Sequence, residues 1–222
     1  MKLQKQNFLY LSAFIIFIGM LLSLIYLTRP VPVVMINYST SLKNLDVNQR
    51  RNVCLAAEKI NGTYIKPNAE FSFNRVVGPR NIQNGFTTAK VYFEKDTFED
   101  VGGGICFISS ALYNAALNAN FKITRRVAHS MPISSFPMGL DATVWYGYGD
   151  LEFLNNTAKN IRIDSKCSYN NLDIVIRGYY KPEIVKITTI KIKESKDQIK
   201  VITRRKTPFN SEKISDDTYY IY

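Results

Sequence analysis

The sequence predicts an α+β protein with a mostly antiparallel sheet and a few helices, preceded by one N-terminal transmembrane helix. Three observations support this prediction. Residues 8–27 are twenty consecutive positions without a charge. Two stretches with helical spacing follow in the first half of the chain, and after about residue 122 apolar residues recur at every second position. Helices early and strands late are typical of α+β folds rather than of alternating folds.

The uncharged segment has the length of a membrane span, because twenty helical residues cover about 30 Å. Lys2 and Lys5 precede it and Arg29 follows it, so the N-terminus should stay in the cytoplasm. A cleaved signal peptide is the alternative, but it would have a shorter apolar region and a small-residue cleavage site. We predict a cytoplasmic tail at 1–7, an uncleaved membrane anchor at 8–28 and a stalk at 29–45.

The rest of the chain is long enough for one extracytoplasmic domain, predicted at 46–180, and a basic β-rich extension at 181–222. Asp46 and Gln49 form a capping-box pattern, which predicts a helix over about 47–60. A triple glycine at 102–104 precedes a second helix, which ends near Asn118. The alternating pattern predicts strands at 122–129, 142–147, 151–154, 161–166, 172–179, 184–193 and 198–205.

The chain is basic, with a formal net charge of +11. An exported basic domain is suited to anionic surfaces such as lipid head groups or wall polymers, and the predicted topology argues against nucleic acid. Residues 181–206 hold nine Lys or Arg against three Asp or Glu. Lysines that alternate with isoleucine also protect a sheet edge from aggregation, so this segment has two interpretations.

The three cysteines, Cys54, Cys106 and Cys167, show no metal-ligand spacing, and the chain has one histidine. We therefore expect no metal and no cofactor. A bridge between Cys54 and Cys167 would leave Cys106 free.

Cys106 follows the glycine run at the first turn of the predicted helix. The free N–H groups and partial positive charge of a helix N-terminus favour a thiolate and can hold an oxyanion. This pattern predicts a cysteine nucleophile, with Gly103, Gly104 and the backbone N–H groups of Cys106 and Phe107 as oxyanion or substrate contacts. The alternative is a buried structural cysteine, which is common.

A thiol nucleophile needs a base, and His129 is the only imidazole in the chain. If the strands at 122–129 and 141–147 pair about Ser135, Asp141 lies opposite His129 and can orient its ring. Asp150 is the second candidate for that role, and either aspartate could instead cap a turn. Arg126 lies near this site and could neutralise a substrate carboxylate, or could be a surface charge.

The chain resembles the VanW family, which is named for a protein encoded with glycopeptide-resistance genes in Gram-positive bacteria. The residues that carry the resemblance run in order over roughly 65–160 and include Ser109; they are 67–74, 77–80, 102–106, 109–114, 126–130, 139–144 and 150–155.

The resemblance implies a role at the bacterial cell envelope, because VanW-domain proteins resemble peptidoglycan L,D-transpeptidases. Cys106 corresponds to the nucleophile of the family's GGGxC motif. The implied reaction is thiolate attack on a stem peptide, followed by transfer of the acyl group to the amine of another stem in a 3-3 cross-link. The implied partners are peptidoglycan stem peptides, with the membrane contacted through residues 8–28.

One position departs from the family pattern, because Phe107 stands where members usually carry Gln. A phenylalanine side chain cannot donate a hydrogen bond, so the change affects substrate fit, rate or activity itself. The presence of Cys106 together with His129 favours an enzyme. The alternatives are a non-catalytic cell-wall or glycopeptide-resistance accessory protein and a cysteine endopeptidase of peptidoglycan.

Overall fold

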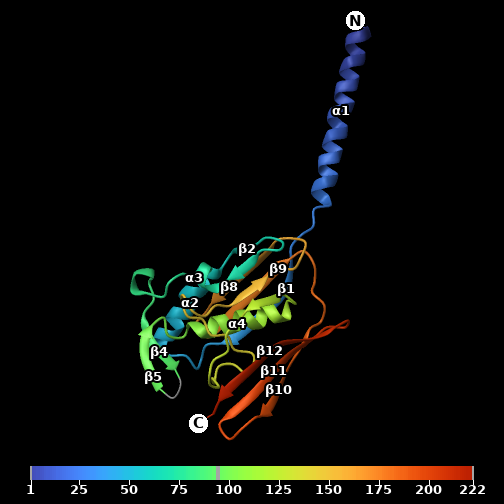
Figure 1. Cartoon of the computed structure of the whole chain (residues 1–222). Coiled ribbons are helices and arrows are strands. Elements are labelled where there is room, and N and C mark those ends of the chain that lie inside the picture. Colours follow the sequence, from blue (N-terminus) through green and yellow to red (C-terminus); the bar gives the residue numbers. More distant parts are fainter. Residues whose placement is uncertain (1, 94–95, 222) are drawn as a thin grey trace. The chain divides into compact units, whose positions relative to one another are not determined.

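The computed structural model describes the backbone of residues 2–93 and 96–221, and their side chains apart from those of 2–9, 12–13, 92–93 and 96–97. The chain divides into two units, Met1–Pro32 and Val33–Tyr222 (Figure 1).

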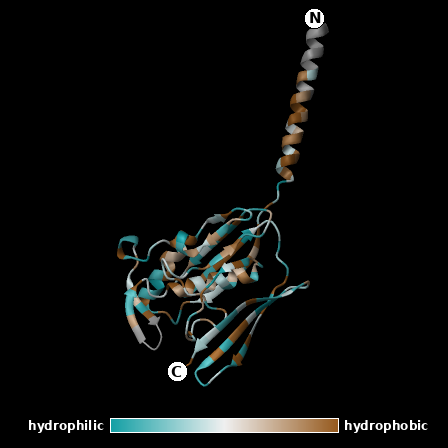
Figure 2. Cartoon of the chain, in the orientation of Figure 1, coloured by the Kyte–Doolittle hydropathy of each residue, from teal (hydrophilic) through white to brown (hydrophobic). Residues whose placement is uncertain are grey.

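The first unit consists of helix α1 (Lys2–Leu27). Most of its described side chains are apolar and exposed, among them Phe14, Ile15 and Leu22 (Figure 2). Within the described residues, no helix meets the combined length and hydropathy expected of a membrane span. The anchor at 8–28 stays a prediction.

A four-stranded antiparallel sheet forms the centre of the second unit (Figure 1). Its strand order is β1-β9-β8-β2, with β1 at Val33–Ser41, β2 at Thr63–Ile65, β8 at Ile161–Cys167 and β9 at Asn171–Gly178. Side chains of β8 and β9 alternate between buried and more exposed, as a half-buried strand requires. The segment predicted as a stalk therefore contains an edge strand of this sheet.

Two helices contact this sheet and each other. Helix α2 (Val47–Ile60) contacts β8, and helix α4 (Ile105–Asn118) contacts β1 and β9. The predicted capping box is confirmed, since Asp46 accepts from the backbone N–H of Gln49 and the Gln49 side chain accepts from that of Asp46. Helix α4 is buried on nearly every side, which makes it the centre of the core.

Shorter elements surround the helices. A second antiparallel sheet consists of β3 (Glu70–Ser72), β7 (Glu152–Leu154) and β6 (Lys122–Arg125), in that order. The other short elements are α3 (Phe73–Val77), the 3-10 turn η1 (Ile82–Asn84) and the hairpin of β4 (Thr88–Phe93) and β5 (Asp96–Val101).

A third antiparallel sheet is formed by β10 (Lys186–Lys193), β11 (Gln198–Lys206) and β12 (Ser211–Tyr220). Its last strand was not predicted. The sheet is docked on the domain: Arg205 donates to the carbonyl of Phe121 over 2.7 Å, and Thr203 donates to that of Gly139 over 3.1 Å. Segment 181–222 is therefore packed against the rest of the second unit rather than trailing from it.

Two strand predictions need correction. The strand predicted at 122–129 ends at Arg125, and the one at 142–147 is not a strand. Only isolated bridges remain there, Val127 with Thr143 and Trp145 with Gly149. The first bridge nevertheless has the predicted register, because pairing of 127 with 143 sets 129 opposite 141.

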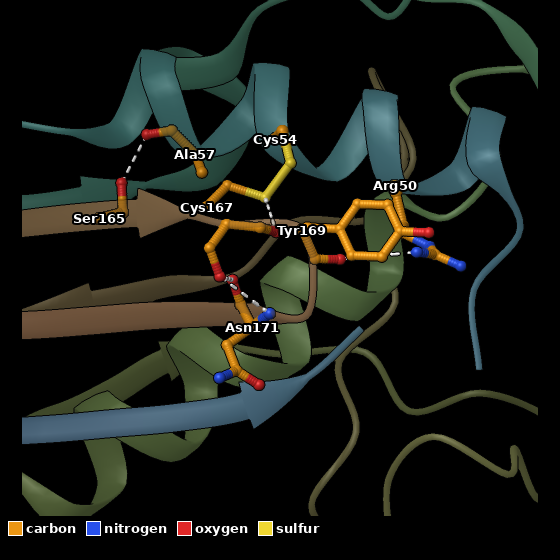
Figure 3. The surroundings of a disulfide bond; sticks show 8 residues. Arg50, Cys54, Ala57, Ser165, Cys167, Tyr169 and Asn171 are labelled. Atoms are coloured by element: carbon orange, nitrogen blue, oxygen red, sulfur yellow. Dashed lines mark hydrogen bonds between the residues drawn. A yellow bond between two sulfur atoms is a disulfide. The ribbon is translucent and has the colours of Figure 1, made fainter. Parts of the chain in front are cut away.

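Cys54 and Cys167 form a disulfide that joins α2 to the end of β8 (Figure 3). The same two elements are also linked by a hydrogen bond from Ser165 to the carbonyl of Ala57. The disulfide closes a separation of 113 residues, and it leaves Cys106 as the free cysteine.

Replacing both bridged cysteines by serine is expected to lower the free energy of unfolding by about 2–5 kcal/mol, because the unfolded chain regains the freedom of a long loop. Urea denaturation with and without reductant measures this difference. Reductant should destabilise the wild type and leave the double variant unchanged; equal stability of the two oxidised proteins would contradict the prediction.

Candidate active site

The glycine run that precedes α4 is packed tightly between α2 and β4. A Cβ on Gly103 would lie 2.5 Å from the carbonyl oxygen of Ala89, and Gly104 has φ +92°. Asn52 of α2 holds the run in place by donating to the carbonyls of Gly103 and Thr87. Gly103 is buried, so packing explains its glycine, and direct contact of Gly103 with substrate is not supported.

Cys106 is the second residue of α4 and is partly exposed. Its Sγ lies 3.8 Å from the carbonyl oxygen of Val144, and the side chain of His129 interacts with the thiol and lowers its pKa. Among the described residues, the backbone N–H of Cys106 has no backbone acceptor. This amide is therefore available to a substrate oxygen, as expected at the first turn of a helix.

His129 is held by Asp141 through two contacts. Its Nδ1 lies 2.6 Å from Oδ2 of Asp141, and its backbone N–H donates to the same oxygen over 2.7 Å. Since Nδ1 faces the carboxylate, Nε2 is the nitrogen left for the Cys106 thiol. The structure thus brings together the three side chains that the sequence analysis selected as nucleophile, base and orienting group.

Asp141 is itself fixed by a buried polar network. Nη2 of Arg126 donates to its Oδ1 over 2.9 Å, and the Tyr219 hydroxyl donates to the same oxygen. Arg126 also pairs with Asp217, so its charge is balanced by two carboxylates. Its side chain is only 4% exposed. A substrate-binding role for the guanidinium of Arg126 is therefore not supported; it holds Asp141.

Polar side chains of α4 set the distance between the nucleophile and the loop that carries Asp141. Ser110 donates to the carbonyl of Cys106 and accepts from the backbone N–H of Ala142, over 2.6 and 2.8 Å. Ser109 is fully buried and donates to the carbonyl of Ala142 over 2.6 Å. Ser109 thus docks the loop and does not face substrate.

The side chain of Phe107 lies in the core, where its ring packs edge-on against Phe136 at 5.2 Å between centroids. Its backbone N–H donates to the carbonyl of Gly104 over 2.9 Å, so it is not free to hold an oxyanion. Neither contact that the sequence analysis expected from Phe107 is supported. Its side chain instead packs against the loop between His129 and Asp141.

The three side chains interact strongly enough to change their ionisation. Burial alone would raise the pKa of the Cys106 thiol, but the hydrogen bond and charge of His129 and the charge of Arg80 outweigh it, so the pKa lies below its usual value. Burial alone would lower the pKa of His129, but its bonds to Asp141 and Cys106 raise it to about 9. For Asp141, burial is outweighed by His129 and Arg126, and the pKa falls to about 2. Relative to the free side chains, these shifts favour a thiolate beside an imidazolium.

Asp150 has a different position from the one considered for it. Its carboxylate accepts from the hydroxyl of Ser72 and from the backbone N–H groups of Asn74 and Leu151. These bonds join α3 to the segment before β7. Asp150 is a structural cap and does not contact His129.

Three residues of the site were not predicted from the sequence: Tyr219, Asp217 and Arg80. Tyr219 and Asp217 belong to β12, far from Asp141 in sequence, and no local pattern marks them. Arg80 follows the glycine and proline of a turn, and these two residues indicate a turn without indicating a charged site.

The rate of Cys106 alkylation by iodoacetamide is expected to begin falling at a lower pH than that of an ordinary thiol, because the pKa of the Cys106 thiol is lowered. An ordinary thiol, with a pKa near 9, already loses about tenfold in rate per pH unit below that pH. The rate falls only when the pH drops through the lowered pKa of the thiol. His129→Gln should restore an ordinary thiol profile; a wild-type profile that already matches an ordinary thiol would contradict the ion pair.

These features define an α+β domain that carries a Cys–His–Asp site at a helix N-terminus. The chain belongs to the VanW family, because the family model described as VanW like protein matches residues 48–177.

Two curated relatives are similar to it. The "Uncharacterized protein YoaR" of Bacillus subtilis (strain 168) is 32% identical over 162 residues, which cover 73% of this chain and 52% of that protein. The "Vancomycin B-type resistance protein VanW" of Enterococcus faecalis (strain ATCC 700802 / V583) is 31% identical over 115 residues, which cover 50% of this chain and 42% of that protein. The chain thus spans about half the length of the relatives that it matches. No solved structure gives a significant match.

Proposed function

We propose that this protein is an extracytoplasmic cysteine acyltransferase that acts on peptidoglycan stem peptides, an L,D-transpeptidase that forms 3-3 cross-links. One observation carries the proposal: the free thiol of Cys106 lies at the start of α4 and interacts with His129, and that histidine is held by the buried carboxylate of Asp141. The similarity to a vancomycin resistance protein supports the choice of cell-wall peptides as substrate.

In the first step, the Cys106 thiolate attacks the carbonyl carbon of the third residue of a donor stem. A carbon–sulfur bond forms, and the negative charge that develops on oxygen is stabilised by the backbone N–H of Cys106. As the intermediate collapses, the carbon–nitrogen bond breaks. His129 gives its proton to the nitrogen of the leaving D-amino acid, and a thioester remains on Cys106.

In the second step, the side-chain amine of another stem attacks the thioester. Neutral His129 accepts the proton that this amine loses, and the carbon–sulfur bond breaks to regenerate the thiolate. Asp141 keeps the imidazole oriented in both steps and stabilises its charged form. The same site would hydrolyse the thioester if water replaced the amine, and an internal peptide bond as substrate would then make it an endopeptidase.

An extracytoplasmic location is part of the proposal. The Cys54–Cys167 disulfide supports it, because structural disulfides persist in oxidising compartments. The uncharged run at 8–27 supports anchoring of the N-terminal segment in the membrane. Carbonate extraction of cell membranes tests the anchor: the protein should remain in the pellet, and release into the supernatant would contradict it.

The function is tested by incubating the purified protein with disaccharide tetrapeptides. Intact-protein mass spectrometry should detect a thioester adduct on Cys106 with loss of one D-amino acid, and product analysis should detect 3-3 linked dimers. Trimmed tripeptides without dimers would show that water, and not a second stem, accepts the acyl group, and would replace the transpeptidase by a hydrolase. Absence of both adduct and product would favour the accessory role.

A further inference from the structure

Arg80 lies directly beside the glycine run that leads to Cys106. A Cβ on Gly102 would lie 2.7 Å from the Cβ of Arg80 and 3.1 Å from its Cγ. The aliphatic part of Arg80 therefore packs on the backbone of Gly102, and a larger residue at 102 would displace it. The loop that positions the nucleophile also positions this arginine.

The guanidinium of Arg80 interacts with two aromatic rings. Its Cζ is 5.5 Å from the ring centre of Phe73 and 5.8 Å from that of Tyr146. Phe73 is buried, whereas Tyr146 is 48% exposed and belongs to the turn between Trp145 and Gly149. Both rings attract the guanidinium charge, and the ring that faces solvent is carried by a surface turn.

Within the described part of the chain, this guanidinium has unused hydrogen-bonding capacity. Nη1 donates to the carbonyl of Gly78 over 3.2 Å, but the buried Nη2 has no hydrogen-bond partner. No described carboxylate lies within ion-pair distance of Arg80. A buried donor without an acceptor is costly, so this nitrogen is suited to receive an anion.

Cys106 and Asp150 both interact electrostatically with Arg80. The oxygens of Asp150 are already engaged by Ser72, Asn74 and Leu151. Arg126, by contrast, is fully paired with Asp141 and Asp217. Of these two arginines, Arg80 is therefore the one able to receive an anion from a substrate held at Cys106.

We propose that Arg80 is the anion-binding group of the site and takes the free α-carboxylate of the residue that leaves the donor peptide. The identity of the ligand rests on the proposed acyl transfer, whereas the anion site itself does not. A planar guanidinium matches a carboxylate through two parallel hydrogen bonds. The site would then select donors whose chain ends one residue after the bond that is broken.

The anion site is tested by comparing two reagents of similar size on Cys106, iodoacetate and iodoacetamide. Iodoacetate carries a carboxylate and iodoacetamide does not, and the ratio of their rates cancels any change in thiolate fraction. Arg80→Gln is expected to lower this ratio about three- to tenfold, because a nearby positive charge is lost. Since Cys54 and Cys167 are bridged, the label reports on Cys106 alone.

Two further variants make the result specific. Arg75→Gln removes the same charge from an exposed arginine of α3, which donates to the carbonyl of Glu70, and should leave the ratio unchanged. Arg80→Lys keeps the charge and should retain most of the ratio. If Arg80→Gln has the wild-type ratio, or if Arg75→Gln lowers it equally, the proposal is wrong.

The substrate is tested with a tetrapeptide donor that ends in a free carboxylate and with its C-terminal amide. The wild type should prefer the free acid in kcat/KM, and Arg80→Gln should lose that preference. Turnover of both peptides at equal rates by the wild type overturns the assignment of the ligand. A lowered alkylation ratio without turnover of either peptide would uphold the anion site and overturn the proposed function.

Discussion

Cys106→Ala is expected to abolish acyl transfer, with a loss of about 10⁴-fold or more in turnover, because the covalent intermediate forms on the sulfur of Cys106. In cells, the variant should lose the 3-3 linked muropeptides that expression of the wild type produces. Liquid chromatography with mass spectrometry of digested cell walls measures this change.

The variant should fold, because Cys106 is partly exposed and is not in the disulfide. Its thermal unfolding therefore serves as the control, and Cys106→Ser provides a second variant with an oxygen in place of sulfur. Should cells that express folded Cys106→Ala have the same muropeptides as those that express the wild type, the protein acts without covalent chemistry and the accessory role is correct.

Asp141→Asn is expected to reduce turnover by about 10³–10⁴-fold and also to destabilise the fold. The amide carries no charge, so it no longer stabilises the imidazolium of His129 or fixes the tautomer of its ring. The side chain of Asp141 is 1% exposed and is paired with the buried Arg126. Loss of one partner from a buried ion pair costs about 3–5 kcal/mol, although Asp217 remains to balance the arginine.

The two effects are separated by a matched variant, Asp150→Asn. Asp150 is also buried and hydrogen-bonded, but to Ser72, Asn74 and Leu151 rather than to His129. It should lose stability in urea denaturation and keep the wild-type pH profile of Cys106 alkylation. If Asp141→Asn also keeps that profile, the carboxylate does not control the ion pair.

The pH dependence of stability follows from the same shifts. The pKa of Asp141 lies below its unfolded value of 3.8, so its contribution is complete above that pH and is lost as the pH falls through about 2. The pKa of His129 lies above its unfolded value of 6.5, so its contribution is complete below that pH and is lost as the pH rises through about 9. Asp141→Asn should flatten the acid limb of the stability curve.

The main helices and several strands could be predicted because each has a local signal. The capping box marked the start of α2, and alternation marked β8 to β11. The pairing of His129 with Asp141 could also be predicted, since the segment between them folds back symmetrically about Ser135. The strand expected at 142–147 failed because Gly147 and Gly149 break the extended run into a tight turn.

The rest of the site depends on contacts between distant parts of the chain. Tyr219 and Asp141 are 78 positions apart in the sequence, and no pattern near residue 219 predicts their hydrogen bond. Arg126 and Phe107 were assigned to substrate because they lie close to the site residues in sequence. Burial decides their roles, and burial of a single side chain cannot be inferred from its neighbours along the chain.

The bond between Tyr219 and Asp141 has a consequence for biogenesis. Synthesis from the N-terminus delivers the thiol, the imidazole and the aspartate before β12. Until that strand docks, Arg126 lacks Asp217 and Asp141 lacks the hydroxyl of Tyr219. The site is therefore complete only after the last strand of the chain has been made and has docked.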